Sequence, residues 1–164
     1  MFALGRNFRD GRVSAALSLA LILCASPLAA QKTILTLTSS TITFNAPTAA
    51  DYIAGHIDSP TGVTFTLSAQ TGASRTTTVS IRSTSANLGG GKVIGDLQWR
   101  RSDLAAWNSM TLTDAQVEQR IQVRNVLNDP WSNTIFFRML LAWTTDAPAT
   151  YSGNYQITLS QTVP

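Results

Sequence analysis

Apolar and polar residues alternate one by one along most of this chain. In GVTFTLSAQ, Val63, Phe65 and Leu67 fall on one side, and the intervening threonine and serine residues fall on the other. Because successive side chains of a β-strand point to opposite faces of a sheet, this period of two predicts strands with one buried and one solvated face. The same period recurs in three further segments: Thr76–Ser83, Asp96–Arg100 and Tyr155–Gln161.

Turn-forming residues separate these alternating segments. The stretches NAPT, DSPTG, QTGAS, NLGGGK, NDPWSN and TDAPAT are rich in residues that favour turns. Short strands at this spacing predict an all-β fold, an immunoglobulin-like antiparallel β-sandwich of about seven to nine strands. The segments KTILTLT and TITF add one or two strands at the front. We expect Asp51–Ile57 to form a short strand or a crossing loop.

One segment fits both a helix and a strand. In LTDAQVEQRIQVR, Thr113 is a candidate helix N-cap, and Val117 and Ile121 are four residues apart. With a period of two, Val117 and Ile121 share the core face of a strand, opposite Arg120. We leave Asp114–Arg124 open between the two but prefer the strand, because a lone helix would interrupt a β pattern that is present elsewhere.

The run IFFRMLLAW, residues 135–143, is the most apolar stretch after residue 30. It is too short to cross a membrane as a helix, and Arg138 lies near its middle. As a strand it places Phe136 and Leu140 on the face opposite the core. Either a loop or polar neighbours cover these two residues, or they belong to an exposed apolar patch that contacts another subunit. The predicted core face holds Ile135, Phe137, Met139, Leu141 and Trp143.

The first thirty residues have the parts of a secretory signal peptide. Three arginines precede the apolar run Val13–Cys24, and small residues follow it. A run of about 12 apolar residues is short of the roughly 20 that span a bilayer, although an uncleaved anchor is the alternative. We expect cleavage after Ala30. One domain, residues 31–164, would then be exported to the periplasm, cell surface or extracellular space, with no transmembrane segment.

Charge and cysteine content narrow the classes of partner. After residue 30 the chain has nine basic and eight acidic residues, a balance that predicts no nucleic-acid partner. The single cysteine is Cys24, inside the predicted signal peptide. The exported domain would therefore contain no disulfide and no thiolate ligand. We expect it to fold around one core.

The residues that usually carry catalysis are sparse. His56 is the single histidine, and there is no G-x-S-x-G or H-E-x-x-H motif. NLGGGK departs from a phosphate-binding loop, because Val93 stands where Ser or Thr should follow Lys92. We read Gly89–Gly91 as a flexible turn. We therefore expect a protein that is not an enzyme, with no catalytic residue, metal or cofactor.

Two tryptophans are candidate contact residues. Trp107 and Trp131 lie in or next to predicted turns, whereas Trp99 is in phase with the core. Exposed loop aromatics stack on sugar rings or dock a partner's apolar groups, and the alternative is that both cap the open end of the sandwich. We expect Arg100 or Arg101 to lie over the Trp107 ring as a cation–π contact.

The segment KTILTLT is the candidate for assembly. It alternates, it lies near the predicted mature N-terminus, and it contains Ile34, Leu35 and Leu37. Such a strand can add to the sheet edge of a neighbouring molecule. The alternative is that it pairs within its own domain.

Three stretches resemble secreted bacterial immunoglobulin-like sandwich proteins. They are the Ile42-x-Phe44 strand, the Asp51-Tyr52-x-x-Gly55 segment and the closing TYSGNYQITL, whose hairpin is similar to that of spore-coat and pilin-type subunits. The resemblance implies a surface or assembly role without an active site. Many members of such families contain cysteines, and residues 31–164 have none.

These observations together predict a non-enzymatic structural subunit at the surface. It would pair through a sheet edge and bury an apolar patch against itself or another surface subunit. The alternative is an extracellular module that binds carbohydrate or another ligand through Trp107 or Trp131.

Overall fold

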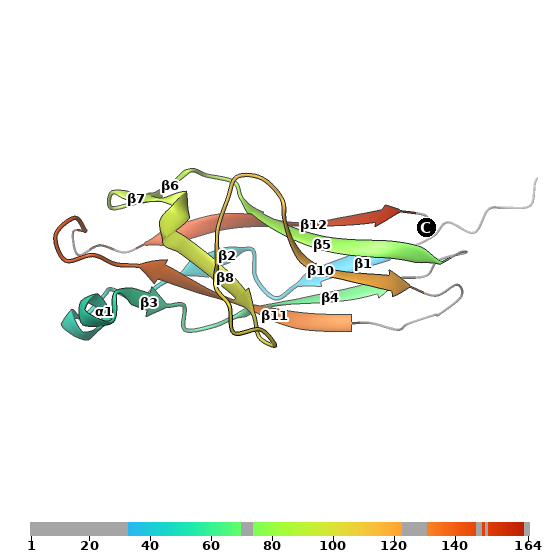
Figure 1. Ribbon diagram of the computed structural model, residues 1–164, viewed down its shortest axis with the longest axis horizontal. Helices are drawn as coiled ribbons and strands as arrows, with labels where there is room; N and C mark the ends of the chain where they lie inside the picture. Colours follow the sequence, from blue (N-terminus) through green and yellow to red (C-terminus); the bar gives the residue numbers. More distant parts are fainter. Residues whose placement is uncertain (1–32, 70–73, 123–130, 147–148, 150, 163–164) are drawn as a thin grey trace, which may run out of the picture.

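A computed structural model of the chain describes residues 33–69, 74–122, 131–146, 149 and 151–162 of its 164 residues. The predicted signal peptide lies outside this part. Within it, twelve β segments form two main sheets and a small hairpin, and every pairing is antiparallel. The two sheets face each other along the length of the molecule (Figure 1). The prediction of an all-β antiparallel sandwich is confirmed.

The first sheet has the strand order β1-β4-β11-β8-β9, and β3 also pairs with β11. Its strands are β1 (Thr33–Leu37), β3 (His56–Asp58), β4 (Val63–Ala69), β8 (Leu97–Arg101), β9 (Asn108–Ser109) and β11 (Trp131–Leu140).

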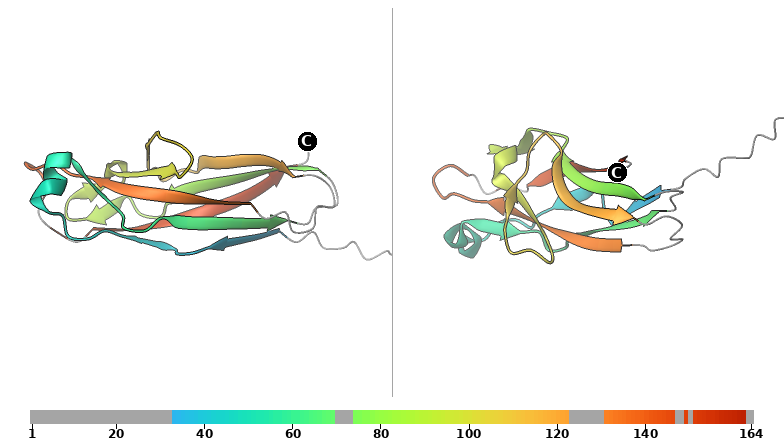
Figure 2. Two further views of the ribbon diagram at one scale, coloured as in Figure 1. Left: turned by 90° about the horizontal axis from the view of Figure 1, so that it is seen from below. Right: turned by 45° about the vertical axis from the view of Figure 1, so that its right-hand side comes forward.

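The second sheet has the strand order β10-β5-β12-β2. Its strands are β2 (Thr41–Thr43), β5 (Arg75–Ser83), β10 (Ala115–Gln122) and β12 (Ser152–Thr162). A hairpin of β6 (Asn87–Gly89) and β7 (Lys92–Val93) leads into the 3₁₀ turn η1 (Ile94–Asp96), and one short helix, α1 (Ala49–Ala54), precedes β3. The helix and the hairpin lie at the same end of the sandwich (Figure 2).

The core lies between the two sheets and follows the predicted alternation. Val63, Phe65 and Leu67 of β4 are buried from the first sheet, and Val79 and Ile81 of β5 are buried from the second. Burying such alternating apolar rows is the main stabilising contribution in a two-layer sandwich.

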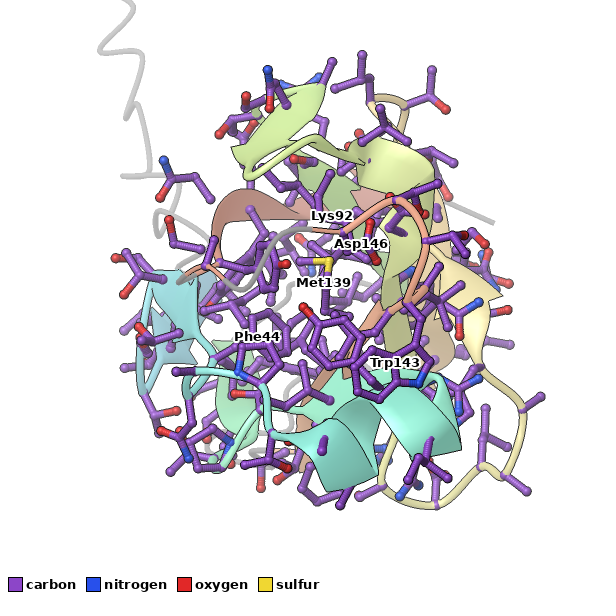
Figure 3. All side chains as sticks on the ribbon, turned by 90° about the vertical axis from the view of Figure 1, so that its left-hand side faces the viewer. Phe44, Lys92, Met139, Trp143 and Asp146 are labelled. Carbon is purple, nitrogen blue, oxygen red and sulfur yellow. The ribbon has the colours of Figure 1, made fainter. Side chains whose placement is uncertain are left out.

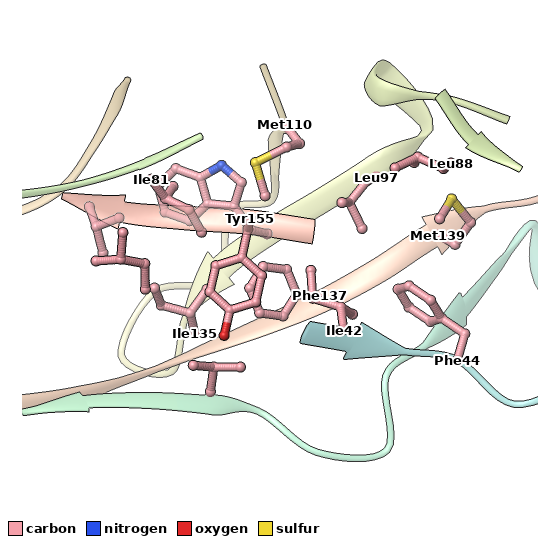
Figure 4. Packing of buried hydrophobic residues seen from close by; sticks show 14 of the residues in the cluster. Ile42, Phe44, Ile81, Leu88, Leu97, Met110, Ile135, Phe137, Met139 and Tyr155 are labelled. Atoms are coloured by element: carbon pink, nitrogen blue, oxygen red, sulfur yellow. The ribbon is translucent and has the colours of Figure 1, made fainter. Parts of the chain in front are cut away.

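Aromatic side chains connect the two layers. The rings of Phe137 on β11 and Tyr155 on β12 lie 5.4 Å apart, between the sheets (Figure 4). The predicted burial of Trp99 on β8 is also confirmed.

The apolar run 135–143 begins as an inner strand. Strand β11 pairs with β4 and β3 on one side and with β8 on the other. Ile135, Phe137 and Met139 are buried as predicted. The burial predicted for Trp143 is wrong: this side chain is 60% exposed.

The chain leaves the sheet before Trp143, which explains that error. Strand β11 ends at Leu140, and the Asp146 carboxylate accepts the Ala142 N–H at 2.6 Å. This bond holds the following residues in a turn, so the period of two no longer applies to them.

The ambiguous segment is a strand, β10, but its register shifts. Gln116 pairs with Ser80 and Glu118 pairs with Val79, so Val117 forms a β-bulge. One extra residue reverses the phase of every side chain that follows it. Val117 is buried as predicted, whereas Ile121, predicted to share its face, is 71% exposed.

The segment expected to be a strand or loop at Asp51–Ile57 is largely helical. Thr48 caps α1: its Oγ1 accepts the Asp51 N–H at 3.4 Å, and Asp51 Oδ2 accepts the Thr48 N–H at 2.7 Å. This reciprocal pair is a capping box, which satisfies N–H groups at the helix start. Gly55, with φ of 73°, ends the helix in the left-handed conformation, and β3 follows directly.

Candidate interaction surfaces

Strand β1 is one edge of the first sheet. It pairs with β4 in register from Thr33↔Ala69 to Leu37↔Phe65, so the segment that holds Ile34, Leu35 and Leu37 pairs within its own domain. No second strand among the described residues lies along its other side. The strand therefore keeps an open edge while its inner side is occupied.

The direction of the main-chain groups on β1 follows from one hydrogen bond. The Thr38 N–H, just after the strand, donates to the Thr64 carbonyl at 3.0 Å. In an antiparallel pair, the main-chain groups of every second residue point to the partner strand. Thr36 and Ile34 therefore share the orientation of Thr38 toward β4, and the main-chain groups of Leu35 and Leu37 point outward at the open edge.

The side chains of β1 divide between the core and solvent. Leu35 and Leu37 are half-buried and pack against the core, whereas Ile34 is 43% exposed on the outer face. The three candidate contact residues of this segment therefore have different roles. Ile34 lies on the surface beside the edge, and the two leucines hold the strand to its own domain.

The same chain segment provides an edge to both sheets. After β1 the chain turns at Ser39, whose Oγ donates to the Thr41 carbonyl at 2.9 Å, and continues as β2 in the second sheet. The Tyr155 hydroxyl of β12 donates to the Ser39 carbonyl and so holds this crossing in place. Residues 33–43 thus form one side of the sandwich.

Three other edge strands carry features that oppose pairing, whereas β1 does not, and neither does the open side of β12 beyond Asn154. Strand β10 has the bulge at Val117 and the charges of Glu118 and Arg120. Strands β2 and β9 have three and two residues. The β1 sequence TILTL has no charge, no proline and no register shift. Charges, bulges and shortness are the usual protection of sheet edges against association.

A second surface lies on the outer face of β8 and β11, and we name it the arginine–aromatic cluster: Arg100, Trp107, Phe136 and Arg138. The Arg100 guanidinium carbon lies 5.1 Å from the centre of the Trp107 ring and 5.0 Å from that of Phe136. The Arg138 guanidinium carbon lies 4.4 Å from the Trp107 ring centre. The cation–π contact expected for Arg100 is therefore present, whereas Arg101 pairs with Asp103 instead.

The guanidinium groups of the cluster have polar but uncharged partners. Arg100 donates to the Leu104 carbonyl at 3.1 Å, and Arg138 donates to Gln98 Oε1 at 2.7 Å. No carboxylate among the described residues lies within salt-bridge distance of either group. The cluster is therefore a locally positive surface whose guanidinium groups lie against the Trp107 and Phe136 rings.

The two apolar residues on this face are partly covered. Phe136 is half-buried beneath Arg100 and beside Gly62, where an added Cβ would lie 2.9 Å from the ring. Leu140 is also half-buried and pairs with His56 of β3. Of the two interpretations of this pair, cover by polar and main-chain neighbours fits the geometry better than an open apolar patch.

Trp131 is not an exposed loop residue, contrary to one reading of the sequence. It begins β11 and is 6% exposed, and the Arg120 guanidinium carbon lies 4.8 Å from its ring centre. Pairing with Leu67 brings Trp131 into the sheet, beyond the predicted turn. A ring covered in this way has no open face for a sugar.

The sequence analysis missed two exposed apolar side chains near the end of α1, Trp143 and Ile53. Trp143 stacks on Tyr52 of α1 with ring centres 4.7 Å apart, and the neighbouring Ile53 is exposed. Sequence alternation assigned Trp143 to the core and assigned no helix, so neither member could be recognised. The following TTD sequence, typical of a turn, was the available signal.

A buried ion pair at this end was also missed. Lys92 of β7 and Asp146 have side chains that are 4% and 6% exposed, and Lys92 Nζ lies 2.5 Å from Asp146 Oδ2. Asp96 Oδ2 lies 3.8 Å from the same nitrogen. Figure 3 shows the Lys92 and Asp146 side chains meeting at this end of the sandwich. The ammonium group keeps the pKa of Asp146 below its usual range, although burial alone would raise it.

Gly89–Gly91 do form a turn, as predicted. All three have positive φ, and they link β6 to β7. The prediction that NLGGGK is a turn was therefore right. Its lysine, however, points into the protein, which the glycines gave no means to predict.

The surroundings of His56 do not assemble a nucleophile and base. His56 Nδ1 contacts the Ala54 carbonyl at 3.0 Å, and the Thr48 hydroxyl donates to Asp51 at 2.7 Å. These residues line a depression of about 340 Å³ beside α1. In the described part of the chain, no three His, Cys, Asp or Glu side chains are grouped as metal ligands. Nor does any helix there reach the length and apolarity of a membrane span.

Comparison of the chain with protein-family models, curated protein sequences and solved structures gave no match. The class that the fold defines is an antiparallel β-sandwich with unprotected edges at β1 and at β12 beyond Asn154. No narrower family follows from the comparisons.

Proposed function

We propose that the protein is a non-enzymatic, exported structural subunit that assembles with further copies of itself through the open edge of β1. The observation that carries this proposal is that β1 is an open edge without the protection found on β2, β9 and β10. β1 offers an open edge of five residues with no charge, proline or bulge, with Ile34 exposed beside it. Beyond Asn154, β12 has a second uncharged open edge, because among the described residues it pairs there with β5 alone. An added strand would pair with the outward main-chain groups of Leu35 and Leu37.

Residue chemistry supports self-pairing at this edge. Two antiparallel β1 strands would bring uncharged threonine and isoleucine side chains together, with no like charges opposite each other. Ile34 would lose its exposure in the contact, which adds apolar burial to the main-chain hydrogen bonds.

Two matched variants test this assembly. Ile34→Lys places a charge beside the β1 edge, whereas Ile121→Lys makes the same change on β10 at an exposed position. We expect light scattering during size exclusion to show concentration-dependent association of the wild type. Ile34→Lys should abolish it and Ile121→Lys should retain it. A wild type that stays monomeric at millimolar concentration, or loss through Ile121→Lys alone, would count decisively against β1.

Export is the second part of this proposal, and it rests on residues 1–30. The arginines, the short apolar run and the small residues before Gln31 support it. Expression of the full chain in a bacterial host should give a processed protein outside the cytoplasm whose first residue is Gln31. An intact Met1 on a cytoplasmic protein would argue against it.

A second candidate function is binding of an acidic carbohydrate at the arginine–aromatic cluster. The specific observation is that the guanidinium groups of Arg100 and Arg138 lie beside Trp107 without a carboxylate partner in the described part of the chain. Planar guanidinium groups bind carboxylates in a bidentate manner. Because these groups already lie against the Trp107 ring, a charged sugar fits better than stacking of a neutral one.

Calorimetric titration with an oligogalacturonate tests this candidate. Arg138→Gln should weaken binding about tenfold or more. Arg82→Gln should leave it unchanged, since Arg82 is also a strand arginine bonded to a glutamine, on the other sheet. Equal affinity of the two variants, or no heat of binding to the wild type, would remove the cluster as a binding site.

A further inference from the structure

The buried Lys92–Asp146 pair is the least ordinary chemical feature of the described residues. An amine and a carboxyl group contact each other at 2.5 Å with almost no exposure, and a second carboxylate, Asp96, lies 3.8 Å from the amine. Burying an ion pair gives little net stability, because both charges lose their hydration. The arrangement therefore raises the question of what else these three groups do.

We propose that Lys92 and Asp146 condense to form an intramolecular amide bond, with Asp96 as the group that transfers protons. This proposal stands apart from assembly at β1 and does not depend on it. The reactants are held in place by different elements: β7 carries Lys92, the η1 turn carries Asp96, and the turn after β11 carries Asp146. Folding thus brings Asp146 from a distant part of the chain to Lys92 and Asp96, which are four residues apart.

The local contacts orient each group for this reaction. The Ala142 N–H donates to Asp146 Oδ2 at 2.6 Å, which fixes the carboxyl group and withdraws electron density from it. The Val93 N–H donates to Asp96 Oδ2 at 3.2 Å and holds this second carboxylate beside Lys92. Groups held in reactive geometry reach effective concentrations of about 10⁵–10⁸ M.

The step balances without any added reagent. Within the pair, the ammonium proton of Lys92 passes to Asp146, giving an amine and a carboxylic acid. The amine nitrogen attacks Asp146 Cγ, Asp96 accepts a proton from that nitrogen and returns it to the departing hydroxyl, and one water leaves. The C–O bond breaks as the C–N bond forms, and Asp96 ends as it began.

Burial makes the neutral forms that react less costly to reach. The charged pair is the resting form, and a low-dielectric site reduces the difference in free energy between an ion pair and its neutral counterpart. Exclusion of water also slows the reverse hydrolysis. Residues 31–164 contain no cysteine, so an amide would be the covalent cross-link that disulfides cannot supply here.

Mass spectrometry of the purified full chain tests the proposal directly. We expect an intact mass lower than the sequence mass of the processed chain by one water molecule. Trypsin should fail to cleave at Lys92 and should release peptide 83–100 joined to peptide 139–164. Unlinked peptides 83–92 and 93–100 from fully folded wild type, with no mass deficit, would overturn the proposal.

Matched variants separate the reaction from the fold. Asp96→Asn keeps the Lys92–Asp146 contact and an acceptor for Val93 but removes the proton carrier, so the mass deficit should disappear while circular dichroism stays unchanged. Asp114→Asn makes the same change at a surface carboxylate, next to Arg82, and should keep the cross-link. A cross-link that forms equally well in Asp96→Asn would overturn the role given to Asp96.

Discussion

At the scale of single residues, Gly62 is a position where the packing leaves no space for a side chain. Gly62 precedes β4 and lies against β11. An added Cβ there would come within 2.5 Å of Thr134 Cγ2 and 2.9 Å of the Phe136 ring. Both neighbours belong to an inner strand that pairs on two sides, so they cannot move away easily. Nothing in the local sequence DSPTG, which reads simply as a turn, indicated this restriction.

Gly62→Ala should therefore destabilise the protein by about 1 to 3 kcal/mol through overpacking. The control is Gly95→Ala, where an added Cβ meets nothing within 4 Å and φ is not positive. That change should alter stability by less than about 1 kcal/mol, in the stabilising direction. Chemical denaturation of both variants gives the comparison. Equal stabilities of the two variants would show that Phe136 of β11 can shift to make room for the added methyl group.

Two buried tyrosines give the protein an alkaline limit. Burial raises the pKa of Tyr155 to about 12 and that of Tyr151 to about 12, from an ordinary value of 10. Between these values the folded state keeps protons that the unfolded state loses. The free energy of unfolding should therefore fall as pH rises from about 10 to about 12, and should be unaffected by these groups below pH 10.

Urea denaturation across this pH range checks the prediction, with Tyr155→Phe as the test variant. Phenylalanine removes one of the two late ionisations, so the decline should become shallower. At neutral pH the variant should lose about 1 kcal/mol, because the hydroxyl no longer donates to the Ser39 carbonyl. An unchanged alkaline slope would mean that Tyr155 ionises freely.

At the scale of strands, the alternation of apolar and polar residues predicted burial correctly for some strands and wrongly for others. The segments around Phe65, Ile81 and Leu97 were placed correctly, because β4, β5 and β8 carry no bulge residue of their own. Ile121 was misplaced because the bulge at Val117 inserts one residue into β10. Trp143 was misplaced because β11 ends three residues earlier. Neither a bulge nor a strand end alters the composition of the pattern, so the sequence alone gives little sign of them.

Because of the bulge, we expect substitutions at two isoleucines to differ in their effect on stability. Ile121→Thr on β10 should change stability by no more than about 0.5 kcal/mol, since the side chain is mostly in water. Ile81→Thr on β5 should cost about 2 to 4 kcal/mol, because it loses buried apolar volume and buries a hydroxyl. Thermal or urea unfolding measures both. Similar losses of stability in the two variants would instead support an uninterrupted strand with Ile121 buried, as the sequence predicted.

The sequence predicted some residues of the candidate surfaces and not others, again because it carries local signals only. The edge segment with Ile34 and the loop residue Trp107 could be chosen from sequence, because edge strands and turn aromatics have local signatures. Lys92 could not, since a lysine after three glycines is ordinarily solvated. Its burial depends on Asp146, a residue far along the chain.

The whole molecule is a sandwich whose pairings are mostly non-local. Strand β1 pairs with β4, but β5 pairs with β10 and β12, and β4 pairs with β11 across a large part of the chain. Each such pairing requires a long loop to close before its contacts contribute. The described fold is therefore expected to form slowly for its size.

Stopped-flow refolding followed by tryptophan fluorescence should show a main phase in the millisecond-to-second range. Trp99 and Trp131 are buried and report on formation of the first sheet. Trp107→Phe and Trp143→Phe together should leave this phase intact. A main phase in microseconds would indicate that local contacts, not strand pairing, limit folding.

The sequence by itself determined that this chain is all-β, where most strands lie and which of their faces are buried. These are local properties, because a period of two depends on neighbouring residues alone. The tertiary structure decided which strands are left with open edges, where a bulge reverses the pattern, and that Lys92 meets Asp146 away from water. Those outcomes depend on which distant segments pair. That choice minimises the free energy of the whole chain, and no single segment encodes it.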